Sequence, residues 1–354
     1  MKKILFAVFG LLTLMAFSSV ALGETQTLTF TFAGDCTLGC NYGWEDDWRA
    51  FPNVVEPEGY DYPFREVQSL FATDDLTVVN LEGVLKDDTS GRASGRKYNF
   101  YGKTDYTGIL LAGSVEAVGL GNNHMHDYGE AGVESTKAAL DAAGIGWALD
   151  DDAYIFEKNG IRVAFLSYLQ DAFFARMDNM EEIVRELKED KGCSAVVMLL
   201  HIGTEYADKH NRSQLRSAHI AIDAGVDLVM ECHAHVIQGC HIYKNRNVVY
   251  SMGNFSFGGS RNIKSAQTPS VVVRVTMDFD EDGTYLGQQM TLWPARNTSG
   301  KGYNNYQPYL VDGEDAAKIL KKMQQDTDYH LEAFVDGQGA VQKYLPAEEQ
   351  EESE

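Results

Sequence analysis

Apolar and polar positions along the chain fall into short runs typical of strands and longer stretches with helical spacing. Residues 26–34 combine β-branched and aromatic side chains, which predicts a strand, and residues 130–144 show a helical pattern closing at Gly144. The same patterns predict strands over 76–82, 115–123, 153–168, 193–201, 226–232, 247–257, 270–280 and 284–293, and helices over 63–75, 178–190, 212–224 and 314–325. This alternation predicts an α/β protein with one mixed sheet, or two sheets packed face to face with helices outside.

Two turn signals refine this pattern. Asn159 and Gly160 divide 153–168 into two strands, because Asn-Gly is a strong hairpin signal. The turn at 281–283 joins the last two strands, so the three strands over 247–293 are expected to be antiparallel.

The first 23 residues have the layout of a secretory signal peptide. Lys2 and Lys3 precede an apolar run over 4–20, and small residues follow before Glu24. We therefore expect an exported, extracytoplasmic protein, with an uncleaved N-terminal membrane anchor as the alternative. We expect one domain over 24–300, a helical extension of it over 301–343, and an acidic disordered tail over 344–354.

The chain is strongly acidic, with a formal net charge of −22. Such a surface repels nucleic acid and anionic lipid, so neither is expected as a partner. A phosphorylated or carboxylated substrate stays possible at a metal site, because bound cations reverse the local field.

Five cysteines in an exported protein leave at least one unpaired. Cys36 and Cys40 could bridge locally, as could Cys232 and Cys240, with Cys193 left over. The alternative is that these cysteines are small buried apolar residues, and the sequence does not decide between the two.

Polar side chains follow five apolar strands at the point where each strand ends. In an open parallel sheet the carboxyl ends of the strands face one crevice, so these side chains can converge. Asp, Glu, Asn and His in that position favour a polynuclear site for hard metals. The five segments are FAGDCTLG around Asp35, VVNLEG around Glu82, GLGNNHMHDYG around His124, VVMLLHIGTEY around His201, and DLVMECHAHV around His233 and His235.

The stretch 121–129 is the most specific of these segments. The amide oxygen of Asn123 can ligate a hard cation while His124 faces the substrate as a general acid or charge stabiliser. Asp127 could hold that imidazole or cap the helix that follows. His126 is interpreted as a spectator.

The remaining candidates lie after two later strands. His201 is the better ligand in its segment, and Glu205 is included as a second candidate. His233 and His235 are expected on the same side of an extended segment, because alternate residues share a face. Some of these residues have structural alternatives. Asp35 could cap a turn, Asn80 could orient its loop, Gly253 and Asn254 could shape a turn, and His210, His219, His241 and His330 are treated as surface or packing residues.

Six motifs in order resemble the bacterial capsule synthesis protein family of the CapA/PgsA type, which is associated with poly-γ-glutamate. They are GDCTLG, NLEG, NNHMHDYG, HIGTEY, HAHVIQG and YSMGNFSF, and they cover roughly residues 27–260. This family is similar in fold to calcineurin-like metallophosphoesterases, which implies a four-layer αββα sandwich of two mixed β-sheets and a dinuclear metal centre. The resemblance implies a ligand set of Asp35, Glu82, Asn123, His201, His233 and His235, with His124 beside the phosphoryl group.

The sequence departs from the phosphoesterase pattern at two positions, Thr37 and Glu82, and from the family's own usual pattern at two more, Ala234 and Cys232. Thr37 replaces the histidine of an Asp-x-His motif, Glu82 replaces an aspartate, Ala234 replaces a proline, and Cys232 takes a place often held by histidine.

Three functional hypotheses follow. The first is an exported hydrolase of the phosphoesterase type in capsule or cell-envelope polymer metabolism, with two divalent cations (Mn, Fe, Zn or Mg) and an anionic polymer or phosphoester substrate. The second is a non-catalytic factor that binds or helps export the polymer through bound cations, in contact with a membrane polymer-synthesis complex. The third is a metal-dependent hydrolase of γ-glutamyl or peptide amides. The aromatic loop 41–62 could be a lid or a polymer-binding edge.

Overall fold

The computed structural model describes residues 25–261 and 269–348, so the expected signal peptide and residues 349–354 of the expected tail lie outside the described residues. Strand β1 (Gln26–Thr37) lies at the centre of the larger sheet. It pairs in parallel with β3 (Leu76–Leu81) on one side and antiparallel with β15 (Pro269–Phe279) on the other. The sheet continues through β6 (Ala117–Gly119) and β7 (Gly146–Ala148) beyond β3, through β16 (Tyr285–Arg296), β17 (Tyr309–Leu310) and β18 (Ala340–Pro346) beyond β15, and through β14 (Asn254–Phe257) beside β1.

The second sheet has parallel strands at its centre and antiparallel strands at its edges. Strand β10 (Ala195–His201) pairs in parallel with β9 (Ile161–Leu169) and with β11 (Leu228–Cys232). The remaining strands are β8 (Asp150–Lys158), β13 (Arg246–Val249) and β12 (Cys240–Tyr243). A small third sheet comprises β2 (Cys40–Asn41), β5 (Phe100–Gly102) and β4 (Val84–Leu85). The chain is thus an α/β protein with several mixed sheets.

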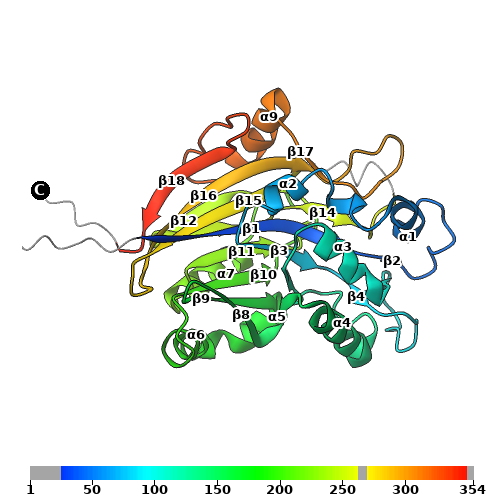
Figure 1. The fold of residues 1–354 in the computed structure, drawn as a ribbon, viewed down its shortest axis with the longest axis horizontal. Coiled ribbons are helices and arrows are strands. Elements are labelled where there is room, and N and C mark those ends of the chain that lie inside the picture. The colour runs from blue at the N-terminus through cyan, green and yellow to red at the C-terminus, as the bar shows by residue number, and fades with distance from the viewer. Residues whose placement is uncertain (1–24, 262–268, 349–354) are drawn as a thin grey trace, which may run out of the picture.

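The two large sheets share one hydrophobic core. Phe30 and Phe32 of β1 pack edge-on or tilted against Phe165 of β9, with ring centroids 5.6 and 6.5 Å apart. Helix α4 packs in a second apolar cluster with the larger sheet, and α5, α6 and α7 pack in a third with the second sheet. Figure 1 shows α5 and α6 along the lower edge of the molecule. The helices are α1 (Phe51–Val55), α2 (Gln68–Phe71), α3 (Thr107–Ala112), α4 (Gly129–Ala143), α5 (Gln170–Arg176), α6 (Met180–Arg185), α7 (Arg212–Asp223) and α9 (Gly313–Gln324).

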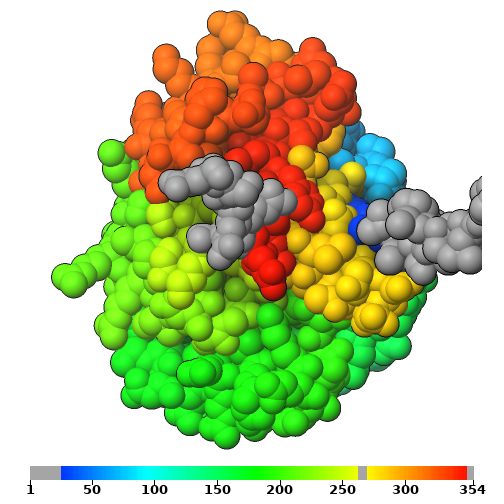
Figure 2. Space-filling view, turned by 90° about the vertical axis from the view of Figure 1, so that its left-hand side faces the viewer, coloured from blue at the N-terminus to red at the C-terminus, as the bar shows by residue number. Residues whose placement is uncertain are grey.

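The C-terminal segment returns to the larger sheet. Strand β18 pairs antiparallel with β16, and α9 packs on the same strand. Figure 2 shows this end of the molecule, where the orange and red segment lies against the yellow strands. Residues 344–346 therefore belong to a strand, although we expected the disordered tail to begin at 344. No helix in residues 25–261 or 269–348 combines the length and the apolar character needed to cross a membrane.

Several predicted elements are confirmed. The hairpin β8–β9 turns at Asn159 and Gly160, both with positive φ, and β15 and β16 pair antiparallel as expected. The helix predicted over 63–75 is reduced to one 3-10 turn and the single turn α2.

The prediction of one antiparallel strand over 247–257 was wrong. It divides into β13 of the second sheet and β14 of the first, and β14 pairs in parallel with β1. Gly253, with φ +75°, allows the chain to pass from one sheet to the other. This crossing places Asn254 beside Asp35, as their register shows.

Candidate metal centre

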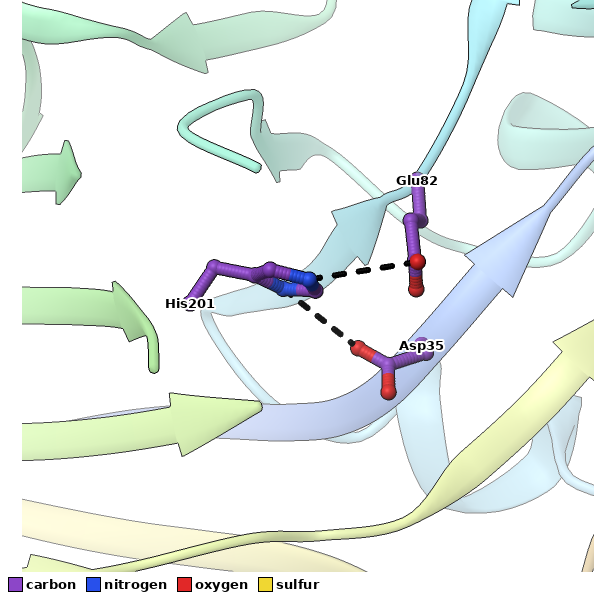
Figure 3. Close-up of side chains that lie close together, drawn as sticks. All are labelled: Asp35, Glu82 and His201. Carbon is purple, nitrogen blue, oxygen red and sulfur yellow. Dashed lines mark ion pairs between the residues drawn. The ribbon is translucent and has the colours of Figure 1, made fainter. Parts of the chain in front are cut away.

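The candidate site lies where the carboxyl ends of parallel strands from both sheets meet. Asp35 lies near the end of β1, Glu82 directly follows β3, and His201 ends β10. One atom of each side chain lies within 4.8 Å of the other two, and all three residues are buried. Figure 3 shows the two carboxylates directed at the imidazole ring. The distances are 3.9 Å from His201 Nδ1 to Asp35 Oδ1 and 3.9 Å from His201 Nε2 to Glu82 Oε1.

Close backbone packing positions Asp35. The backbone N–H of Asp35 donates to the carbonyl of Gly253 at 3.0 Å. A Cβ on Gly34 would lie 1.8 Å from that same carbonyl oxygen, so only glycine fits there. The GD pair of the first motif is therefore explained by the approach of β14 to β1.

The loop after β11 supplies two further imidazoles. His233 Nδ1 lies 3.0 Å from His201 Nε2, and His235 Nε2 lies 3.8 Å from Glu82 Oε1. The expected extended segment is wrong here, because His233 has φ +100° and His235 has φ +57°. Backbone in this region is strained for any residue with a side chain, and such strain is typical of functional sites. Both rings still reach the site, through a bent loop rather than through strand alternation.

Asn123, His124 and Asp127 lie together after β6, as predicted. His124 Nε2 lies 3.8 Å from Glu82 Oε1, while His124 Nδ1 lies 2.7 Å from Asp127 Oδ2. Among the described residues, Asn123 Oδ1 is buried without a hydrogen-bond partner. Asp127 also accepts a hydrogen bond from the backbone N–H of Phe100 at 2.6 Å, so this carboxylate holds the imidazole in place.

Glu205 is placed differently from the other candidates. It is exposed and lines a cavity of about 330 Å³ that also reaches His124 and His235. Its negative charge contributes to raising the pKa of Glu82. Glu205 therefore lies at the rim of the site, outside the compact group of Asp35, Glu82 and His201.

Electrostatics at the centre reflect two carboxylates enclosed together. Burial raises the pKa of Glu82 well above its ordinary value, and repulsion from Asp35 adds to the rise. Burial opposes ionisation of Asp35 too, but the hydrogen bond and charge of His235 outweigh it and lower the pKa of Asp35 to about 2. Burial would lower the pKa of His235, yet Glu82 and Asp35 raise it to about 10. The two carboxylates thus stabilise a positive charge placed beside them, such as that of protonated His235.

Two oxygen atoms at the centre lack a hydrogen bond within the described part of the chain. They are the two buried carboxylate oxygens of Glu82, whereas Asp35 Oδ2 has His235 Nδ1 beside it at 3.2 Å. Leaving a buried acceptor unsatisfied is costly, and a carboxylate costs more than a neutral group. The Asp-Glu-His group could therefore hold a metal ion, which would supply the missing partners.

Three residues outside the predicted ligand and catalytic set shape the site. Asn80 and Asn254 were expected only to shape their loops, and Arg96 was not singled out. The Asn80 side-chain amide donates to Asp35 Oδ1 at 2.8 Å and contacts His201 Nδ1 at 3.2 Å. Asn254 Oδ1 lies 2.8 Å from His235 Nδ1. Arg96 Nη1 donates to Asp127 Oδ1 at 2.6 Å and to the carbonyl of Asn123 at 2.7 Å. Asn80 and Asn254 lie within the NLEG and MGNF motifs, whereas no local pattern marks Arg96.

The departures from the phosphoesterase and family patterns have visible consequences. The Thr37 hydroxyl donates to the carbonyl of Glu82 at 2.9 Å, so it is committed to the backbone. Cys232 is buried beside the site, and burial raises the pKa of its thiol well above the ordinary value. All five cysteines are buried and free, so the bridges considered for Cys36 with Cys40 and Cys232 with Cys240 are not formed.

Comparison with known proteins identifies relatives of the chain. The family model described as bacterial capsule synthesis protein PGA_cap matches residues 29–259. The capsule biosynthesis protein CapA of Bacillus anthracis is 30% identical over 270 residues, which cover 69% of this chain and 63% of that protein. The PGA biosynthesis protein CapA of Bacillus subtilis (strain 168) is 25% identical over 296 residues, covering 75% and 76%. A probable polyglutamine synthesis accessory protein of Mycobacterium tuberculosis is 25% identical over 277 residues, covering 68% and 72%. The chain thus spans less than two thirds of the Bacillus anthracis protein.

Proposed function

The chain belongs to the bacterial capsule synthesis protein family, and on this premise we propose that it is an exported, divalent-metal-dependent hydrolase of the phosphoesterase type. Its role would lie in the biosynthesis of capsule, poly-γ-glutamate or another cell-envelope polymer. The two facing sheets with their outer helices are compatible with the four-layer αββα sandwich of calcineurin-like metallophosphoesterases. The observation that carries the proposal is Glu82, whose two buried oxygens lack any hydrogen-bond partner among the described residues.

The donor set fits divalent metal ions. Carboxylate and amide oxygens suit Mg²⁺ and Mn²⁺, whereas imidazoles suit Zn²⁺ and Fe²⁺. Oxygen donors come from Asp35, Glu82 and Asn123, and imidazole donors come from His201, His233 and His235. This mixed donor set therefore fits Mg²⁺, Mn²⁺, Zn²⁺ and Fe²⁺ and does not select one of them.

The chain's own residues would bind, orient and protonate the substrate. Bound divalent ions supply Lewis acidity and a more acidic bound water. Asp127 accepts the Nδ1–H of His124, which leaves Nε2 directed towards Glu82 and the 330 Å³ cavity. As an imidazolium, with a second proton on Nε2, His124 can give a proton or a hydrogen bond from there to a leaving group. Phe100 packs against the imidazole, with ring centroids 4.2 Å apart, and limits its movement.

Turnover and its metal dependence test this proposal. Chelator-treated protein should lose hydrolysis of a generic phosphoester, and Mn²⁺ or another divalent ion should restore it. A His124→Ala variant should still bind metal but turn over about 10²–10⁴-fold more slowly. His126→Ala, at an exposed neighbouring position, is the matched control and should behave as wild type. Undiminished turnover in Glu82→Ala would contradict the proposal, and product analysis separates phosphoester from γ-glutamyl cleavage.

A second candidate function is polymer binding without catalysis. Segment 86–103 carries five Lys or Arg residues against two aspartates in a chain of net charge −22. Arg92, Arg96 and Lys97 are exposed there, and the adjacent Tyr98 lines the cavity. Exposed cations next in sequence to a cavity-lining residue favour an anionic chain, which the rest of the surface repels. Saturable binding of polyglutamate with no turnover under any divalent ion would favour this function over hydrolysis.

A further inference from the structure

Two histidines outside the candidate metal centre, one on a helix and one on a strand, face each other. His219 lies on α7 and His241 on β12, and their Nε2 atoms are 3.4 Å apart. Both residues are half-buried, on the side of the second sheet that α7 covers. They are 22 positions apart in the sequence, which is why neither is conspicuous there.

The separation of the two nitrogens suits a metal ion better than a hydrogen bond. Hydrogen bonds from N–H donors in proteins cluster at about 2.9–3.0 Å, so 3.4 Å is long for one imidazole donating to the other. A tetrahedral zinc ion has Zn–N distances of about 2.0–2.1 Å, which places two ligand nitrogens about 3.3–3.4 Å apart. The observed spacing matches that second geometry.

Contacts behind the two rings hold them in this arrangement. His241 Nδ1 lies 2.7 Å from Asp328 Oδ2, so Nδ1 carries the proton and Nε2 presents a lone pair. A carboxylate behind a ligating histidine is the usual support for a metal site. The His219 ring stacks on Tyr243, with centroids 3.8 Å apart and planes 12° apart.

Nearby charges leave room for a cation. Lys244 is paired with Asp223 at 2.6 Å, which offsets its repulsion of an incoming ion.

We propose that His219 and His241 form a second metal site that takes a borderline transition-metal ion such as Zn²⁺, Ni²⁺ or Cu²⁺, with water completing the coordination. Imidazole nitrogens are preferred ligands of these ions. A bound ion would tie α7 to β12 and stabilise the folded chain. This site is independent of the proposed hydrolase function, because it shares no residue with the Asp35–Glu82 centre.

Zinc titration of a protein with its main centre disabled tests the site. Asp35→Ala/His201→Ala/His233→Ala/His235→Ala protein, which lacks the imidazole donors of the main centre, is stripped with chelator and titrated with Zn²⁺ by calorimetry. We expect one remaining equivalent of zinc, lost when either His219→Gln or His241→Gln is added. Asp328→Asn should weaken this binding by about 10–100-fold. His330→Gln, at an exposed position, is the matched control and should retain the equivalent.

Two results would overturn the proposal. One is the absence of any zinc equivalent in the disabled protein, and the other is zinc binding that survives both His219→Gln and His241→Gln. Circular dichroism confirms that each variant is folded. Should the disabled protein fail to fold, the same histidine variants in the wild-type chain must remove one class of zinc site and leave the other. Loss of both classes or of neither contradicts the proposal.

Discussion

At the scale of single residues, the candidate centre concentrates backbone strain and buried carboxylate oxygens without hydrogen bonds. His233 and His235 hold positive φ values, which cost about 1–3 kcal/mol each in proteins. Glu82 is enclosed with no hydrogen-bond partner for its oxygens among the described residues. These features destabilise the chain by itself, and a bound metal ion, as we propose, would offset them.

Replacing Glu82 should therefore separate stability from metal binding. Glu82→Leu removes an unsatisfied buried carboxylate and should raise the free energy of unfolding of chelator-treated protein by about 1–3 kcal/mol. The same variant should lose Mn²⁺ binding. Urea unfolding and calorimetry measure the two quantities. Glu130→Leu, at an exposed position, should change stability by no more than about 0.5 kcal/mol. If chelator-treated Glu82→Leu protein were less stable than chelator-treated wild type, the buried Glu82 carboxylate would not be destabilising.

Arg96 provides a second test at this scale. Asp127 is fully buried, and Arg96 is its ion-pair partner at 2.6 Å. Arg96→Ala leaves Asp127 Oδ1 without that partner and should reduce the free energy of unfolding by about 1 kcal/mol. This is the lower end of the usual cost of about 1–3 kcal/mol, because the Arg96 side chain is 41% exposed and solvent screens the pair. Arg96→Lys should recover part of the loss. Arg92→Ala is the matched control, since Arg92 contacts a neutral amide and a tyrosine ring. Equal urea midpoints for Arg96→Ala and Arg92→Ala would refute this role.

Single residues were predictable only where a local pattern marked them. Asp35 and Glu82 each follow an apolar strand, so strand-end logic located both. Asn80 has the same placement, but an amide inside a strand motif is compatible with a purely structural role. Arg96 lies in a glycine- and serine-rich segment without periodicity, and only the folded chain brings it to Asp127.

At the scale of elements, segment 86–103 is positively charged in a chain that is strongly negative overall. Exchanging Arg92 and Lys97 for glutamate should weaken polyglutamate binding by about tenfold, because each exposed ion pair contributes about 0.2–1 kcal/mol. The loss should shrink as salt concentration rises. Fluorescence anisotropy with labelled polyglutamate measures the effect. Lys318→Glu/Lys321→Glu on α9 makes the same change in net charge, so equal weakening by that pair would exclude a specific surface.

Elements were predicted well when their signals were local. The Asn-Gly hairpin and the helix closing at Gly144 depend on a few adjacent residues, and both formed as expected. The run 247–257 has the composition of one strand, yet its halves join different sheets. Periodicity cannot reveal this crossing, because both halves are apolar and buried. The bend of the loop at His233 and His235 was not predicted for a related reason, because tertiary contacts rather than local sequence set its backbone.

At the scale of the whole molecule, the candidate centre exists only where both sheets meet. Asp35 and Glu82 come from one sheet, and His201, His233 and His235 come from the other or from the loop that follows it. An ion bound there would link the two sheets and stabilise the native state but not the unfolded chain. Mn²⁺ at 100 times its Kd should add about 2.7 kcal/mol to the free energy of unfolding. Thermal melting with and without Mn²⁺ measures this shift, and Asp35→Ala should abolish it.

The convergence of Asp35, Glu82 and His201 on a metal ion is the central claim, and anomalous diffraction from crystals grown with Mn²⁺ tests it most directly. The account predicts at least one anomalous peak within bonding distance of both Asp35 and Glu82, with an imidazole of His201 or His235 completing the set. Crystals whose manganese lies elsewhere, or whose centre stays empty at saturating Mn²⁺, would contradict it.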